Sequence, residues 1–164
     1  MSEATHLAEG LEEFLGKPDL FWFTSFPTAV AGLTAIQAAR IPGARFNSVW
    51  GVTLHLTLCQ RYALCLVCGE KVDAAAFFSE GAWPAVLHPE SEEDWQCAKT
   101  ELLEVNQALA QVASRLLPAD LEMEIAPGQF KRYQYIQGHL AHNSYHLGEI
   151  ISIRHMLGLW LENT

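Results

Sequence analysis

The run from Gly138 to Gly158, GHLAHNSYHLGEIISIRHMLG, is the stretch that most constrains the fold. Its apolar residues recur at helical spacing and no proline interrupts them, so it predicts a helix. At about 100° per residue, one face of this helix is a stripe of six side chains: His139, His142, His146, Glu149, Ile153 and Met156. This spacing is typical of a core-facing stripe, yet its first four positions are ionisable. Ionisable groups facing a core are costly unless something satisfies them, and a metal ion is the most economical candidate.

The alternative for each histidine taken alone is a hydrogen-bonded core or surface residue. The pair His142 and His146 favours metal binding, because at i and i+4 two helical side chains can grip one ion. A third ligand has to come from elsewhere in the chain.

A second informative helix is expected from about Ser48 to Cys68, ending at Gly69. It is apolar nearly all round, which is typical of a helix at the centre of a core. His55 stands inside it and is therefore either paired with a polar neighbour or binding something. Cys59 and Tyr62 lie one and two turns further along the same face, so they would line whatever His55 lines.

The rest of the chain predicts further helices and no sheet, because no segment shows sustained alternation of apolar and polar residues. The expected helices are Ser2 to Leu15, about Asp19 to Gly32 with a kink or restart at Pro27, Ser91 to about Leu117, and about Lys131 to Leu157. Residues 70–90 and 119–130 are expected to be connections. Four principal helices, the first one broken, predict an all-α four-helix bundle with crossover connections. In such a bundle His55 can meet His142 and His146 across the core.

Length and charge limit the remaining possibilities. At 164 residues the chain is predicted to form one domain, 1–164. A net charge of −9 disfavours binding to nucleic acid and to anionic membrane surfaces. The sequence shows neither an apolar run of about 18 residues nor a signal peptide. Its four cysteines (Cys59, Cys65, Cys68 and Cys97) are interpreted as reduced, which predicts a cytoplasmic protein.

The segment HNSYHLGEI, followed by RHMLGLW, is similar to the C-terminal signature of the DinB-like (YfiT-like) metalloprotein superfamily. That family carries H-x-x-x-H-x-G-Q on a helix, followed by an apolar run that ends in a Leu-Gly-x-Trp type of sequence. Further upstream, S-V-W-x4-H resembles the family's Ser-x-Trp element that leads to a helical histidine. The resemblance covers roughly Trp22 to Gly69 and Gln137 to Trp160.

The resemblance implies a DinB-like bundle that binds a divalent metal through His55, His142 and His146, and it also implies a homodimer. His139 has no counterpart among these ligands and is treated as a neighbour of the site. Glu149 stands where the family has glutamine. A carboxylate there can orient a ligand, hold a proton or raise the affinity for metal.

Three imidazoles leave a divalent ion with an open position, as in catalytic sites, and both Zn²⁺ and Ni²⁺ suit them. The resemblance implies transfer of a low-molecular-weight thiol to an electrophile, with a small-molecule substrate. Arg61 and Arg154, which could hold an anionic thiol, are interpreted as surface residues. The alternatives are a metal-dependent hydrolase with Glu149 as general base, and a non-catalytic metal-binding or stress-response module.

Overall fold

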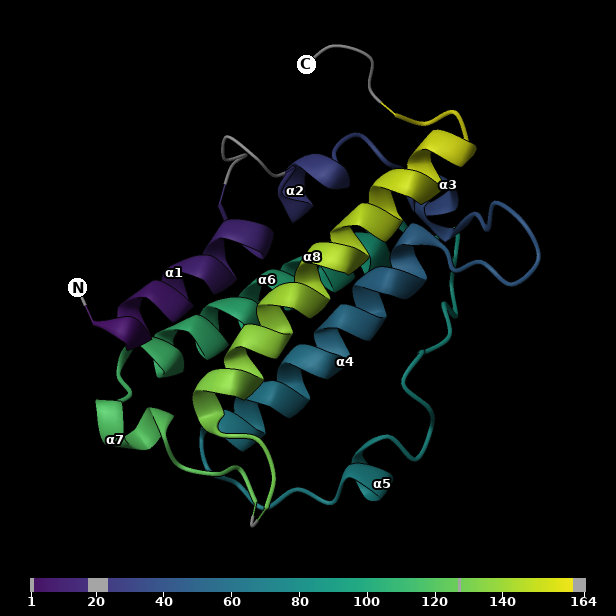
Figure 1. Cartoon of the computed structure of the whole chain (residues 1–164). Helices are drawn as coiled ribbons and strands as arrows, with labels where there is room; N and C mark the ends of the chain where they lie inside the picture. The colour runs from purple at the N-terminus through teal and green to yellow at the C-terminus, as the bar shows by residue number, and fades with distance from the viewer. Residues whose placement is uncertain (1, 18–23, 127, 161–164) are drawn as a thin grey trace.

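The computed structural model describes residues 2–17, 24–126 and 128–160, and within these ranges the protein is all-α. Four helices are long: α1 (Glu3–Leu15), α4 (Val49–Val67), α6 (Glu92–Ser114) and α8 (Arg132–Met156) (Figure 1). Four are short: α2 (Phe26–Ala29), α3 (Ala35–Ala39), α5 (Ala74–Phe77) and α7 (Pro118–Leu121). The described residues contain no strand, and their only β-type pairing is an isolated bridge between Glu124 and Lys131.

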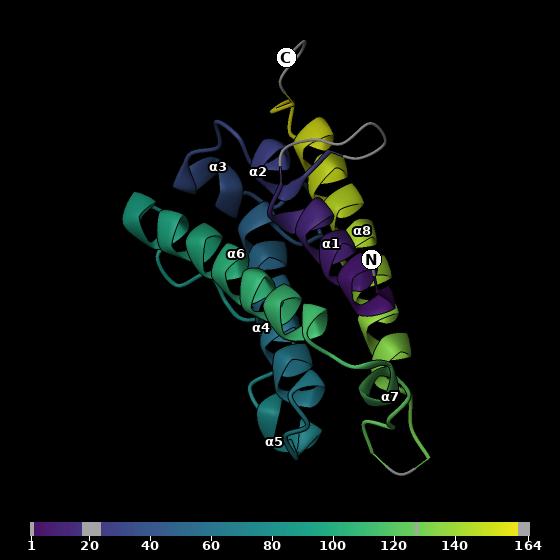
Figure 2. The ribbon, with the colours of Figure 1, turned by 90° about the vertical axis from the view of Figure 1, so that its left-hand side faces the viewer.

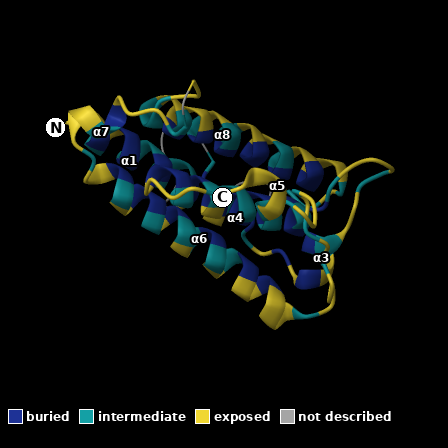
Figure 3. Ribbon diagram, turned by 90° about the horizontal axis from the view of Figure 1, so that it is seen from below, coloured by how far each residue is buried: buried dark blue, intermediate teal, exposed yellow. Residues whose placement is uncertain are grey.

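The four long helices pack against one another. Helix α4 contacts α6 and α8, and α1 contacts the same two helices, so each long helix has two long neighbours (Figures 1 and 2). Their buried residues face inward, and buried and exposed positions alternate along α6 at helical spacing (Figure 3). The all-α prediction is confirmed for the described residues.

Two apolar clusters fill the interior. One surrounds Trp50 and Trp95, whose ring centroids are 5.4 Å apart, and the Trp95 indole donates a hydrogen bond to the Leu33 carbonyl. The other contains Leu11, Leu109 and Ile136, where α1, α6 and α8 meet. Burial of this apolar surface is the main force that holds the helices together.

A polar network lies inside this apolar interior. The Gln60 side-chain amide of α4 donates to the side-chain oxygens of Asn106 on α6 (3.1 Å) and Asn143 on α8 (3.3 Å). Asn106 in turn donates to the Leu11 carbonyl of α1 at 3.1 Å. All three amide side chains are fully buried, so one network links all four long helices.

The predicted helix starts agree with the structure where a side chain caps the helix. Ser48 accepts from the Gly51 N–H and Ser91 accepts from the Asp94 N–H, so α4 and α6 begin directly after them. Gly69 has a φ of +84°, the left-handed conformation expected just beyond the end of α4. Helix α6 ends at Ser114, three residues before the predicted Leu117.

Two predicted segments differ from the structure. The helix expected from Asp19 to Gly32 falls partly on residues 18–23, which lie outside the described residues. Of the remainder, only Phe26–Ala29 is helical, and Pro27 stands in its first turn, where its missing N–H costs nothing. The predicted connection 119–130 begins inside a helix, because Pro118 starts α7. None of the described helices combines the length and apolarity needed to cross a membrane.

Candidate metal centre

His55 is buried in the middle of α4, and one of its ring nitrogens forms a hydrogen bond within the protein. Its Nδ1 lies 2.6 Å from the Ala82 carbonyl oxygen. Because a carbonyl can only accept, Nδ1 carries the proton and Nε2 has a free lone pair. The Trp83 indole stacks on the other side of the ring, with centroids 3.9 Å apart and planes inclined by 9°. The connection between α5 and α6 therefore fixes both the tautomer and the orientation of His55.

His146 on α8 is oriented in the same way by a carboxylate. Its Nδ1 lies 2.7 Å from Glu149 Oε2, and Glu149 Oε1 accepts a 2.9 Å hydrogen bond from the Asn47 side chain. His146 Nε2 is buried and has no hydrogen-bond partner among the described residues. Metal-ligating histidines commonly donate their second N–H to a carboxylate in this arrangement.

His142 completes the cluster from one turn earlier on α8. Its Nε2 lies 3.2 Å from His55 Nε2, and its ring centroid lies 4.6 Å from that of His146. The ligand atoms of all three histidines lie within 4.8 Å of one another. Two nitrogens bound tetrahedrally to one zinc ion at about 2.0–2.1 Å are about 3.4 Å apart. The His55–His142 distance is close to that value, and the three imidazoles together could hold a single divalent ion.

Burial keeps the imidazoles of His142 and His146 neutral, as a metal ligand must be. Desolvation lowers the pKa of His142 to about 3, and the neighbouring imidazoles His146, His139 and His55 add to the effect. Desolvation also lowers the pKa of His146, although Glu149 opposes this shift. Lone pairs are therefore available for a cation at neutral pH.

His139 lies one turn before His142 and stands outside the cluster. It is only 8% exposed, and its Nδ1 has no hydrogen-bond partner among the described residues. Burial lowers the pKa of His139 to about 4. Its ring lies beside those of Tyr135 and His142, with centroids 5.4 and 5.6 Å away.

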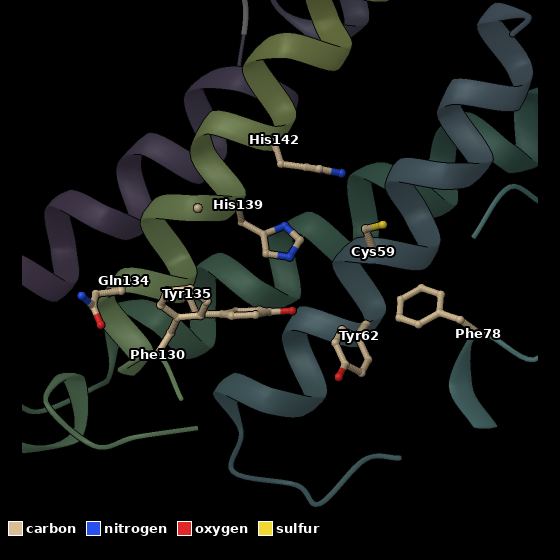
Figure 4. A pocket seen from close by; sticks show the side chains of 9 residues that line it. Cys59, Tyr62, Phe78, Phe130, Gln134, Tyr135, His139 and His142 are labelled. Atoms are coloured by element: carbon tan, nitrogen blue, oxygen red, sulfur yellow. The ribbon is translucent and has the colours of Figure 1, made fainter. Parts of the chain in front are cut away.

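A pocket of about 470 Å³ opens between α4 and α8 beside His142 (Figure 4). Its lining residues are Cys59, Tyr62, Phe78, Phe130, Gln134, Tyr135, Gly138, His139 and His142. Cys59 Sγ lies 3.7 Å from His55 Nε2, and burial raises the pKa of this thiol to about 11. His142 belongs to both the pocket and the histidine cluster, so the two are continuous.

Several contributors to the site carry no signal in the sequence pattern. Ala82, Trp83 and Phe78 lie in the segment interpreted as a connection, where no periodicity indicates which side chains turn inward. Asn47 has the residue type of a helix cap and instead holds Glu149. Only Trp83, a large aromatic residue among small residues and prolines, indicates in the sequence that this connection packs against the helices.

The two arginines interpreted as surface residues have different positions. Arg61 is exposed and forms an ion pair with Glu101. The interpretation was wrong for Arg154, which is 1% exposed. Its guanidinium donates to the carbonyls of Ala29 (2.7 Å), Ala31 (3.0 Å) and Leu159 (2.7 Å). Backbone oxygens from a distant segment and from just beyond the end of α8 thus compensate for its burial.

No family model matches the chain, and neither a curated protein nor a solved structure does so. Function is therefore inferred from the three histidines, the groups that orient them and the adjoining pocket.

Proposed function

We propose that the protein is a divalent-metal-dependent enzyme whose ion is held by the Nε2 atoms of His55, His142 and His146. The observation that carries this proposal is the arrangement of the second ring nitrogens. The Ala82 carbonyl and the Glu149 carboxylate each accept a hydrogen bond from the Nδ1–H of one histidine, which turns the free Nε2 lone pairs to one point. Core histidines with only a packing role have no need of such convergence.

The donor set favours Zn²⁺ or Ni²⁺, since imidazole suits both. Three protein ligands leave at least one position open, which is typical of catalytic rather than structural sites. A bound ion of this kind lowers the pKa of a water or thiol at its open position. Trp83 covers one face of His55 and limits the access of water from that side.

We further propose that the reaction is transfer of a low-molecular-weight thiol to an electrophile. In this reaction the thiol sulfur forms a bond to an electrophilic carbon, the bond from that carbon to its leaving group breaks, and the leaving group and the thiol proton are released together. The support is the resemblance to the DinB-like superfamily, to which we assign the chain as part of the same proposal. The pocket beside His142 provides space for the electrophile.

The competing hydrolase requires Glu149 to act as a general base. Both of its oxygens are already engaged, Oε1 with Asn47 and Oε2 with His146. A general base must lie within hydrogen-bond reach of the substrate proton that it abstracts. Both oxygens of this carboxylate are instead hydrogen-bonded to Asn47 and His146. Its position favours a role in orienting His146.

Two measurements on the purified protein test the proposal. Elemental analysis is expected to show about one equivalent of a first-row metal, and metal-loaded protein is expected to conjugate thiols to monochlorobimane. Ester or amide cleavage without thiol would favour the hydrolase. Bound metal with neither activity would favour the non-catalytic module, and a protein that takes up no metal would refute the centre itself.

A further inference from the structure

The residues that line the pocket between α4 and α8 are largely aromatic and carry no Lys, Arg, Asp or Glu. Four of its nine lining residues are aromatic rings: Tyr62, Phe78, Phe130 and Tyr135. None of the nine is Lys, Arg, Asp or Glu. Its volume of about 470 Å³ lies within the range of sites that enclose small molecules, about 300–1,000 Å³. These walls suit a ring-containing, largely apolar molecule.

The charges around the pocket argue against an anionic occupant. Arg61, one residue before the lining residue Tyr62, is paired with Glu101. Lys131, next to the lining residue Phe130, is paired with Glu122. None of the nine lining residues is cationic, so a carboxylate, sulfonate or phosphate in the pocket would meet no positive side chain in its lining, and the net charge of −9 repels it further.

Three lining residues, Cys59, His139 and His142, bring polar side chains to the pocket. His139 and His142 project from α8 toward α4 in Figure 4, on the same side as Cys59 of α4. A ligand that carries one hydrogen-bonding group on this side can pair with the polar atoms of the lining residues His142 and Cys59.

From these observations we infer that the pocket binds a neutral, ring-containing small molecule with a single polar group, and that this molecule reaches His142. The inference names the class of electrophile for the proposed metal centre and so rests on the proposed function. It also excludes heavily charged electrophiles from this pocket, because nothing in its lining neutralises them.

A pair of fluorescent probes tests this inference, since they differ mainly by one charge. N-phenyl-1-naphthylamine is neutral, and 8-anilino-1-naphthalenesulfonate has the same skeleton with an added sulfonate. Titration of each into the full-length protein is expected to show the neutral probe binding at least about tenfold more tightly. Equal affinities, or tighter binding of the sulfonate, would overturn the inference.

Two glycines of α8 provide a blocking variant and its control. Gly138 lines the pocket, and a Cβ added there meets no heavy atom within 4 Å. Gly138→Leu is therefore expected to fill part of the pocket and weaken the neutral probe at least about tenfold. Gly148→Leu, on the same helix but outside the lining, is expected to leave binding unchanged. Leucine favours a helix more than glycine does, so both variants should fold.

Adding Ni²⁺ separates this inference from the proposed function. In the wild type, the ion is expected to quench the fluorescence of the bound neutral probe, because His142 borders both sites. In His146→Ala, which lacks a proposed ligand outside the lining, the quenching should be lost and the probe affinity kept.

Probe binding without metal uptake would refute only the metal centre. Metal uptake without probe binding, or an effect of Gly148→Leu equal to that of Gly138→Leu, would refute only the pocket inference.

Discussion

The Nε2 atoms of His55 and His142 lie 3.2 Å apart, although the two residues are separated by 87 positions in the chain. Two nitrogens at this distance must share either a proton or a metal ion, because their lone pairs would otherwise repel each other. The third imidazole, His146, lies within the same 4.8 Å cluster. Three converging imidazoles favour a shared metal ion over a shared proton.

Removing one imidazole of this cluster should abolish tight metal binding. We expect His142→Ala to weaken Zn²⁺ binding more than about 100-fold, since two ligands remain where three stood. Isothermal titration calorimetry and the rise in Tm on adding metal measure this loss. His6→Ala, which removes an exposed histidine of α1, is the matched control and should bind like the wild type. Equal Tm shifts in both variants would contradict the centre.

The carboxylate of Glu149 should matter through His146 rather than through direct contact with substrate. We expect Glu149→Gln to lower metal affinity about 10–100-fold, because a neutral amide holds the Nδ1 proton of His146 less strongly. Asn47→Ala should have a smaller effect in the same direction, since it removes only the support of Glu149. Unchanged affinity combined with lost turnover would instead indicate that Glu149 is a proton carrier.

Burial of His139 predicts a dependence of stability on pH in the metal-free protein. Its pKa is about 4 when folded, against an ordinary value of 6.5, so the unfolded chain binds the proton more readily. Stability should therefore be full above pH 6.5 and fall as the pH drops from about 6.5 to 4, with a slope on the order of 1 kcal/mol per pH unit from this residue. Urea unfolding in the presence of a chelator measures this slope.

Two variants test whether His139 causes this dependence of the unfolding free energy on pH. His139→Asn should make the slope shallower over the same pH range, because the group that takes up the proton on unfolding is gone. His6→Asn, at an exposed position, should leave the slope as in the wild type. A slope that survives in His139→Asn would show that other groups cause it.

The buried Arg154 should stabilise the fold without taking part in the site. Arg154→Met removes the donors to the Ala29, Ala31 and Leu159 carbonyls, so we expect a loss of about 2–4 kcal/mol in the free energy of unfolding. Arg115→Met, at an exposed position just beyond α6, should change it by less than about 0.5 kcal/mol. Metal affinity per folded molecule should be unchanged in both variants.

The helical part of the site could be predicted because helices have a period. Spacing alone placed His142 and His146 on one face of α8, and the apolar composition of α4 placed His55 inside the core. The caps at Ser48 and Ser91 fixed where the helices begin. Periodicity and capping are local properties, and local properties can be read from a single sequence.

The rest of the site depends on contacts between distant segments, which no local pattern encodes. Asn47 meets Glu149 across 102 positions, and Arg154 meets the Ala29 carbonyl across 125. The Ala82 carbonyl and the Trp83 ring reach His55 from a connection without periodicity. The size and the neutral lining of the pocket also depend on how these connections fold.

The buried amides of Gln60, Asn106 and Asn143 have a consequence for where the histidines of α8 point. Each residue along a helix turns the side chain by about 100°, so slipping α8 by a single position would carry Asn143 away from Gln60. The apolar contacts around it tolerate such errors more easily than unpaired buried amides do. Asn143 directly follows His142, so the pairing that penalises a misrotated α8 is also what aims its imidazoles at α4. The amide pairing of Gln60 and Asn143 thus also sets the direction of the histidines on α8.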